Sequence, residues 1–452
     1  MKVARRFLIA GCAAVFLAAV SPRSLTAQSP AAPTAPAQAA APANSQQAYT
    51  LPPDKLAKAI AHTRIVEIVA IIDAIWSVVF IWILLSTRAW SGIEGWALRM
   101  AKRRWLQGVL FFFAFFLLTT FASLPLSAYL HEVSLAYGIS VQGWGSWFGD
   151  QAKTLGLTLV AGVPVLLLFH WIVRRWPRRY WLGVWIATVP VLVLFMFVEP
   201  LVEPLFYKFE PLTKNYSQLV QELEKVAART GTNIPPDRMF LMKASMKTNG
   251  LNAYVTGLEA TKRIVVWDTT AGRIPDDEVL FIFGHESGHY VLHHIPKTIA
   301  GYAMALFFAY WACAAIAAWL ARRFGPRWGV LSSEDSAQSE SWQSSRTGFV
   351  VLLFVVYLAN FILQPAQSAF SRYLEHQADV YGQEAIHGIV ADPQATAVAA
   401  FNTLGAAWLE DPNPNRFIEF WFYDHPSTQR RATFALHYDP WANGGRGEFF
   451  AK

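Results

Sequence analysis

The stretch HESGH at residues 285–289 decides how the rest of this chain is interpreted, because it combines two potential metal ligands with a potential base. Residues four apart share one face of a helix, so His285 and His289 can both point at one metal ion. Glu286 then lies beside that ion, where its carboxylate can take a proton from water. Pro275, followed by three acidic residues at 276–278 and then an apolar run, predicts a helix that starts shortly before this stretch.

The pattern H-E-x-x-H is typical of zinc proteases, and it predicts one Zn²⁺ per chain. The alternative is a chance match, which is improbable because the chain contains only 11 His among 452 residues. Histidine and carboxylate ligands favour zinc, although another divalent ion can substitute in vitro. We therefore expect an enzyme, a metalloendopeptidase, in preference to a non-enzymatic membrane scaffold or transporter. A scaffold has no need to retain the base Glu286.

The composition indicates a membrane protein. The chain is 54% hydrophobic and only 15% charged, which is too apolar for a soluble protein of this length. Its net charge of +7 comes from basic residues that cluster beside apolar runs, and several of its 19 Trp lie at the ends of those runs. This pattern indicates a lipid bilayer as a partner and not nucleic acid. Both cysteines, Cys12 and Cys313, lie inside apolar segments, so no disulfide and no thiolate metal site is expected.

The predicted fold class is a mostly α, multi-pass membrane protein with a zinc protease domain that contains a small β-hairpin or sheet. Six apolar runs are long enough to cross a bilayer, and they lie at about 65–85, 106–130, 155–173, 181–198, 299–320 and 349–363. The expected organisation is four membrane helices in 64–199, a protease domain with the metal-binding helix in 200–297, two membrane helices in 298–366, and the rest of the protease domain in 367–452. Since HESGH ends just before the fifth run, the active site should lie at the membrane boundary.

The N-terminal residues 1–27 have basic residues, an apolar run at 7–20 and small residues up to Ala27. This is typical of a secretory signal peptide, and an uncleaved first membrane anchor is the alternative. Residues 28–63 begin with an Ala/Pro-rich stretch that predicts a linker.

The loops give a prediction of membrane orientation. Basic residues concentrate in three segments, at 88–104, 174–179 and 322–346, which lie on the same side of the membrane if the six runs alternate. The positive-inside rule places that side in the cytoplasm. The metal-bearing segment would then face the periplasm of a bacterial inner membrane, as an exported N-terminus also implies.

A third metal ligand is expected after the last apolar run, where Glu375 and Asp379 are four residues apart and share a helical face. One of them would complete a site of two histidines and a carboxylate, and the other would orient a ligand histidine from outside. Spacing alone does not choose between them, and a solvated acidic face is the alternative.

His293 and His294 follow the motif closely. His294 falls on a different helical face from the ligand pair, so both are interpreted as membrane-interface residues.

Several segments, in order along the chain, resemble the type I CAAX prenyl endopeptidases, which are integral-membrane gluzincin zinc metalloproteases. The similar segments are EPLFYKFEPL at 203–212, NAYVTG at 252–257, KRIVVWDT at 262–269, HESGH at 285–289, SRYLEHQAD at 371–379, and HPS at 425–427 followed by Arg431. The resemblance implies a bacterial-type member with a barrel of membrane helices around a water-filled chamber. The family has seven membrane helices, which this chain reaches only if 7–20 is retained. Eukaryotic members present the zinc side to the cytosol, the opposite of the orientation predicted from the loop charges.

The resemblance also assigns roles. It makes Glu375 the third ligand and Glu286 the general base. The outer residues that support the site are Asp379, Arg372 and Arg431. Asn252 and Ala253 would pair with an extended substrate, for which a plain structural hairpin is the alternative.

His425 would hydrogen-bond the reacting oxyanion, although His425-Pro426 is equally typical of a helix start. The expected substrate is a peptide or protein, with or without an attached lipid. Misfolded or stalled envelope proteins are the alternative substrates. A site-two-type intramembrane protease is disfavoured, since the motif flanks a membrane run and does not lie within one.

Overall fold

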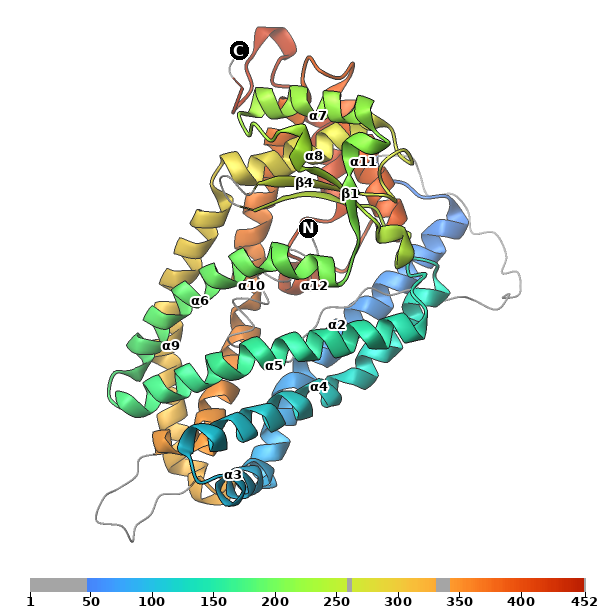
Figure 1. The fold of residues 1–452 in the computed structure, drawn as a ribbon. Helices are drawn as coiled ribbons and strands as arrows, with labels where there is room; N and C mark the ends of the chain where they lie inside the picture. Colours follow the sequence, from blue (N-terminus) through green and yellow to red (C-terminus); the bar gives the residue numbers. More distant parts are fainter. Residues whose placement is uncertain (1–46, 258–261, 331–341, 451–452) are drawn as a thin grey trace.

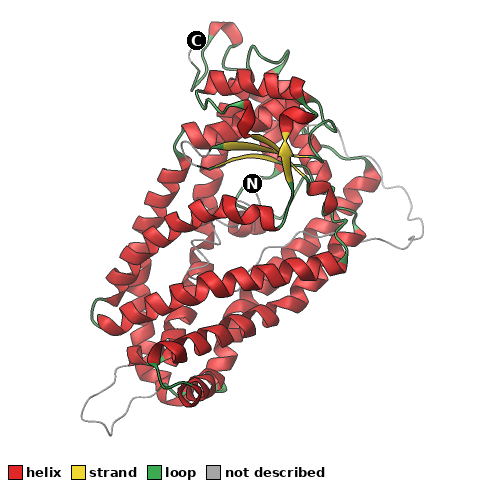
Figure 2. Ribbon diagram, in the orientation of Figure 1, coloured by secondary structure: helices red, strands yellow, loops and turns green. Residues whose placement is uncertain are grey.

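The structure, a computed structural model, describes residues 47–257, 262–330 and 342–450. Figure 1 shows long helices that extend from a cap of shorter helices, and Figure 2 shows one small sheet within that cap. The helices are α2 (Pro53–Ser86), α3 (Ala89–Met100), α4 (Arg104–Ala136), α5 (Trp144–Arg175), α6 (Tyr180–Val202), α7 (Ser217–Thr230), α8 (Asp276–Val291), α9 (His294–Trp328), α10 (Arg346–Ile386), α11 (Pro393–Ala407), α12 (Arg416–Phe422) and α13 (Thr428–His437). The strands are β1 (Phe209–Pro211), β2 (Met239–Met242), β3 (Ala253–Thr256) and β4 (Arg263–Trp267). The predicted fold class, mostly helical with a small sheet, is confirmed.

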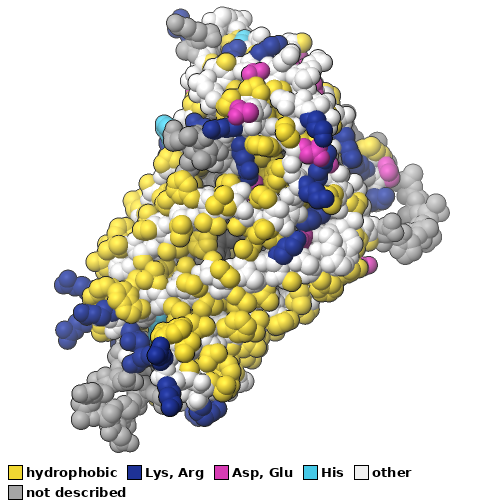
Figure 3. Space-filling model, in the orientation of Figure 1, with side chains coloured by type: hydrophobic (Ala, Val, Ile, Leu, Met, Phe, Trp, Pro, Cys, Tyr) yellow, Lys and Arg dark blue, Asp and Glu magenta, His cyan; other side chains and the backbone are white. Residues whose placement is uncertain are grey.

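Six helices in the described part of the chain are long and apolar enough to cross a membrane. They span Pro53–Ser86, Arg104–Ala136, Trp144–Arg175, Tyr180–Leu205, His294–Trp328 and Arg346–Ile386, and each contains one of the six predicted apolar runs. Their outward surfaces are covered by hydrophobic side chains, as Figure 3 shows for one face. The predicted signal peptide or first anchor at 1–27 and most of the Ala/Pro-rich segment lie outside the described residues.

The three basic segments meet at one end of the membrane helices, as alternation predicts. Arg88, between α2 and α3, donates from Nε to the carbonyl of Arg327 at 3.0 Å. Gln343 donates to the carbonyl of Pro177, in the turn between α5 and α6, at 3.2 Å. Figure 3 shows Lys and Arg side chains at this end without Asp or Glu among them, whereas those at the opposite end are mixed with Asp and Glu. The short helix α3, which the sequence did not predict, contributes the buried Glu94, whose carboxylate accepts from the backbone N–H groups of Arg346 and Thr347 at the start of α10.

The sheet presents β3 as a free edge. Its strand order is β1-β2-β4-β3, with β2 and β4 parallel and the outer pairs antiparallel. The predicted pairing of 252–257 with 262–269 is confirmed, whereas β1 and β2 were not predicted. Trp267 donates its N–H to the carbonyl of Asn252 at 3.1 Å. Because polar groups alternate in direction along an antiparallel strand, those of the next residue, Ala253, point away from β4.

Helices α8 and α10 pack together through glycines. Gly284 and Gly288 lie on α8, and Gly382 lies on α10. A Cβ atom at Gly382 would lie 2.8 Å from the backbone nitrogen of His285, and a Cβ at Gly288 would lie 2.9 Å from the Cβ of Tyr381. The helix that contains HESGH and the helix that contains Glu375 can therefore approach closely only because these side chains are absent.

Helix α10 continues without a break from the membrane-spanning part into the part that contains the sheet, although a domain boundary near 366 was expected. Pro365 lies inside the helix and does not end it. Near the end of α10, the fully buried Glu384 accepts backbone hydrogen bonds from Glu448, Phe449 and Phe450 at 2.5, 2.8 and 2.9 Å. The segment 448–450 is thus tied to the helix that contains Glu375.

Candidate metal centre and catalytic site

Three side chains predicted as metal ligands converge on one point. The Nε2 atoms of His285 and His289 are 3.1 Å apart, and they lie 3.5 and 3.4 Å from the two carboxylate oxygens of Glu375. One ligand atom from each residue lies within 4.8 Å of the others. The cause is the α8–α10 contact, which brings Glu375 opposite the histidine pair. Two imidazoles and one carboxylate form a donor set that suits Zn²⁺ with an open coordination position.

The outer nitrogen of His285 is held by a carboxylate. Asp379 Oδ1 lies 2.9 Å from His285 Nδ1, so the Nε2 of that ring faces Glu375. Arg431 in turn binds Asp379 with two hydrogen bonds, Nε to Oδ2 at 2.9 Å and Nη2 to Oδ1 at 2.5 Å. Burial would lower the pKa of Arg431, but the neighbouring Asp379 carboxylate raises it above its ordinary value, so the guanidinium stays charged. This arrangement matches the support predicted for Asp379 and Arg431.

The outer nitrogen of His289 faces another histidine. His294 Nδ1 lies 3.0 Å from His289 Nδ1, and only 2% of His294 is exposed. The expectation that His294 faces away from the ligand pair was therefore wrong, although His294 does lie at the start of a membrane-spanning helix. The helix ends after Val291 and a new one starts at His294, so the helical face assumed from the sequence does not apply. The adjacent His293 is exposed.

Glu286 lies on α8 beside the histidine pair and lines a cavity of about 560 Å³. It is 7% exposed. Burial raises the pKa of its carboxyl above the usual value, and the neighbouring His285 partly offsets that rise. A buried carboxylate with a raised pKa is suited to accept a proton and release it again.

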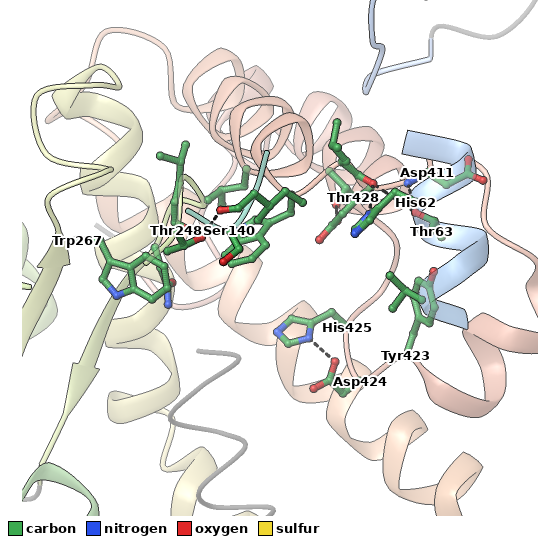
Figure 4. A pocket seen from close by; sticks show the side chains of 18 of the residues that line it. His62, Thr63, Ser140, Thr248, Trp267, Asp411, Tyr423, Asp424, His425 and Thr428 are labelled. Atoms are coloured by element: carbon green, nitrogen blue, oxygen red, sulfur yellow. Dashed lines mark hydrogen bonds and ion pairs between the residues drawn. The ribbon is translucent and has the colours of Figure 1, made fainter. Parts of the chain in front are cut away.

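The cavity lies between the protease part and the membrane helices. Its lining comes from α2, α4, α5, α8, α11, α12, α13, the β3 segment and the loops before α5 and before α13. It includes His62, His131, Trp147, Asn252, Ala253, His285, Glu286, Tyr423, His425 and Arg431. Figure 4 shows one part of this wall, with His425 and Asp424 on one side and Trp267 across the space. The loop between α4 and α5 closes the cavity wall by pairing with 247–249, where Val141 donates to the carbonyl of Lys247 at 3.0 Å.

His425 adjoins the ligand group. Its Nε2 lies 3.1 Å from Glu375 Oε2 and its Nδ1 lies 2.7 Å from Asp424 Oδ1. Burial would lower the pKa of His425, but the carboxylates of Glu375 and Asp424 raise it above the usual value. A positively charged imidazole can donate from both nitrogens, from Nδ1 to Asp424 and from Nε2 toward Glu375. Asp424 was not predicted, and its position directly before His425 is the sequence signal that could have identified it.

Arg372 lies further from the ligands than predicted. It donates to the carbonyls of Glu419 and Tyr423 at 3.1 and 2.6 Å. It therefore holds the end of α12 and the segment that leads into His425, and it acts on the site only through that segment. Asn252 and Ala253 both line the cavity, with Ala253 on the free edge of the sheet. The structure thus brings together the residues predicted from HESGH, 371–379, 252–253 and 425–431, with Arg372 at the periphery.

Comparison with known proteins gives two matching family models. Residues 213–438 match the model of peptidase family M48, and residues 37–208 match a model described as the CAAX prenyl protease N-terminal region with five membrane helices. The two matches adjoin, and they include nearly all of the described residues.

Individual relatives agree with these models. The chain is 31% identical to the uncharacterized metalloprotease YhfN of Bacillus subtilis, over 85% of this chain and 86% of that protein. It is 27% identical to CAAX prenyl protease 1 of Saccharomyces cerevisiae, over 71% of this chain and 70% of the yeast protein. The crystal structure of S. mikatae Ste24p has the same fold, with a TM-score of 0.71 at 23% identity, and the match covers 85% of this chain and 89% of the other.

Proposed function

Because this chain belongs to peptidase family M48 and is therefore a membrane-embedded metallopeptidase that hydrolyses peptide bonds, we propose that it is a zinc endopeptidase whose metal is held by His285, His289 and Glu375. The observation that supports this most directly is the convergence of two imidazole nitrogens and a carboxylate beside the buried Glu286.

His285, His289 and Glu375 would hold the zinc ion, which would supply a Lewis acid to polarise a water molecule and the scissile carbonyl. Asp379, supported by Arg431, holds the ring of His285 so that its Nε2 faces the ligand position. Such outer hydrogen bonds fix both the tautomer and the orientation of a ligand ring.

Glu286 acts as the general base. Its carboxylate takes a proton from the attacking water and passes that proton to the leaving amine when the C–N bond breaks. Its burial supports this assignment, since a raised pKa makes the carboxylate a stronger base toward the proton of the attacking water.

His425 stabilises the reacting oxyanion. With Nδ1 directed at Asp424, the ring is fixed so that an Nε2–H donor points toward the ligand group. A donor aimed at developing negative charge stabilises the transition state more than the ground state. Asp424 is a positioning residue for this donor.

The peptide lies extended along the edge of β3. Ala253 offers an N–H and a carbonyl on the side away from β4, and it lines the same cavity as Glu286. An extended chain can add to such an edge by backbone hydrogen bonds, with side-chain pockets that give selectivity.

The proposed substrate class is a peptide with a C-terminal prenylated cysteine motif, which the names of the yeast and other relatives suggest. A cavity beside membrane helices suits an extended peptide with an apolar attachment. The other substrate class is unprenylated, misfolded envelope protein, which an exported N-terminus would favour.

The proposed location is a bacterial inner membrane with the metal site facing the periplasm. The three basic segments meet at the end of the membrane helices remote from the sheet, which supports this orientation by the positive-inside rule. A membrane-impermeant thiol reagent applied to intact spheroplasts tests it. Cysteine placed at the exposed Glu224 of α7 should react, and cysteine placed at Arg178 should react only after lysis.

The decisive experiment compares wild type with Glu286→Gln and a matched control, Glu278→Gln. Both glutamates are buried on α8, but Glu278 does not line the cavity. We expect about one zinc per chain in all three proteins, and cleavage that falls by about 10²–10⁴-fold in Glu286→Gln alone. A farnesylated peptide and its unprenylated twin, assayed side by side, distinguish the two substrate classes. Absence of zinc from the wild type, or undiminished cleavage by Glu286→Gln, would refute the proposed mechanism.

A further inference from the structure

His294 is in contact with a proposed zinc ligand although it lies outside the metal-binding motif. It is the first residue of the membrane-spanning helix α9, and only 2% of it is exposed. Its Nδ1 lies 3.0 Å from Nδ1 of His289, and the ring centroids are 5.0 Å apart at an interplanar angle of 77°. The two rings thus meet edge to face through their Nδ1 atoms.

The turn between α8 and α9 creates this contact. On an unbroken helix, a residue five positions after His289 would be rotated about 140° away from it. Helix α8 ends at Val291, and His293 adopts the left-handed conformation with a φ of 55°. This reversal in the backbone brings the side chain of His294 back against the His289 ring.

The tautomers of the two rings follow from the geometry. If Nε2 of His289 binds a metal, its proton is on Nδ1, and a buried N–H requires an acceptor. Nδ1 of His294 lies within hydrogen-bond distance of that nitrogen, at 3.0 Å. His294 then accepts at Nδ1 and keeps its own proton on Nε2.

We infer that His294 is a positioning residue that fixes the tautomer and ring orientation of His289, so that Nε2 is presented as the second metal ligand. This rests on the proposed function. The two ligand histidines thus have different outer partners. His285 is held by Asp379, a charged carboxylate backed by Arg431, whereas His289 is held by a neutral imidazole from a membrane helix.

A consequence concerns the membrane. Because His294 belongs to the first turn of α9, the orientation of the second ligand depends on where that helix begins. Loss of such an outer partner usually lowers metal affinity by about 10–100-fold. The affinity for zinc should therefore respond to changes in the α8–α9 turn that leave all three ligands intact.

Two substitutions of similar size test the inference. His294→Asn places an amide oxygen near the position of Nδ1 and keeps an acceptor, and His294→Leu removes the acceptor. The control is His293→Asn, because His293 is exposed and asparagine tolerates its left-handed conformation. Zinc affinity is measured on the full-length protein in detergent by competition with a chromogenic chelator, and thermal unfolding of the metal-free proteins reports folding.

We expect His294→Leu to bind zinc about 10–100-fold more weakly than wild type, His294→Asn to recover most of that loss, and His293→Asn to match wild type. Equal losses in the Leu and Asn variants would mean that packing and not the acceptor matters, and this would overturn the inference. Wild-type affinity in His294→Leu would also overturn it, while leaving the zinc protease proposal intact. If the Leu variant fails to fold, the test rests on His294→Asn alone. The inference is supported if this variant binds zinc nearly as tightly as wild type and its metal-free form is equally stable. It is overturned if the variant loses about 10-fold or more in zinc affinity. Absence of zinc from wild type would refute both proposals.

Discussion

The substitution Gly382→Ala tests whether the close contact between α8 and α10 sets the geometry of the metal site. The added Cβ would lie 2.8 Å from the backbone nitrogen of His285, 3.0 Å from its Cα and 3.1 Å from its Cβ. These are backbone and near-backbone atoms of the helix that holds both histidine ligands. No side-chain rotation can relieve the contact, so the two helices must separate.

The size of the effect follows from these distances. Carbon atoms pack best at about 3.5–4.0 Å, so relief of the 3.0 Å contact requires a shift of about 0.5 Å or more. Insertion of a methyl group into a well-packed contact costs about 1–3 kcal/mol. The separation of the helices moves His285 relative to Glu375. Since about 1.4 kcal/mol corresponds to a factor of ten in an equilibrium constant, we expect zinc affinity and kcat/KM to fall by about 10–100-fold.

The assay measures zinc affinity by chelator competition, peptide cleavage and thermal unfolding on the same purified protein. The control is Gly156→Ala on α5, an exposed helical position where an added Cβ meets nothing within 4 Å. That variant should retain wild-type zinc affinity and cleavage. If Gly382→Ala retains both within a factor of about two, the α8–α10 contact does not determine ligand placement and the reasoning is refuted.

Three further predictions concern other parts of the site. Ala253→Pro removes an N–H that points away from β4 and that an edge strand can lose without harm to the fold. We expect kcat/KM to fall about tenfold while the melting temperature stays near that of wild type. Equal cleavage by the variant and wild type would show that the substrate does not pair with this residue. Arg431→Lys keeps a positive charge but loses the two-point contact with Asp379, so zinc affinity should fall about tenfold. Unchanged affinity in the same chelator assay would show that Arg431 does not support His285 through Asp379. Removal of the metal with a chelator should abolish cleavage and lower the melting temperature, since a metal at about 1,000 times its Kd stabilises the native state by about 4 kcal/mol. Added zinc should restore both the cleavage and the melting temperature. Cleavage that survives a verified loss of metal would exclude a metal-dependent reaction.

The parts of the site that the sequence predicted are those with local periodicity. His285, Glu286 and His289 lie within about one helical turn, and the pair Glu375 and Asp379 has the same four-residue spacing, so helical geometry alone aligns each group. The membrane helices were predictable for a similar reason, since each is a long uninterrupted apolar run.

The parts that the sequence did not predict depend on contacts between distant segments or on breaks in a helix. Strand β2 pairs in parallel with β4, and this non-local pairing has no hairpin turn to signal it. Gly382 is informative only once α8 is known to pack against it. His294 was misplaced because the left-handed residue at His293 interrupts the helix that the periodicity assumed.

The bond between Glu384 and residues 448–450 has a consequence for the synthesis of this protein. The two histidines of HESGH leave the ribosome first, Glu375 follows almost a hundred residues later, and the segment that fastens the end of its helix follows later still. Domains form as their segments emerge, from the N-terminal side onward. The helix that contains Glu375 is therefore fully packed only after residues 448–450 have emerged, so a nascent chain that lacks them does not yet hold a finished protease beside other newly made proteins.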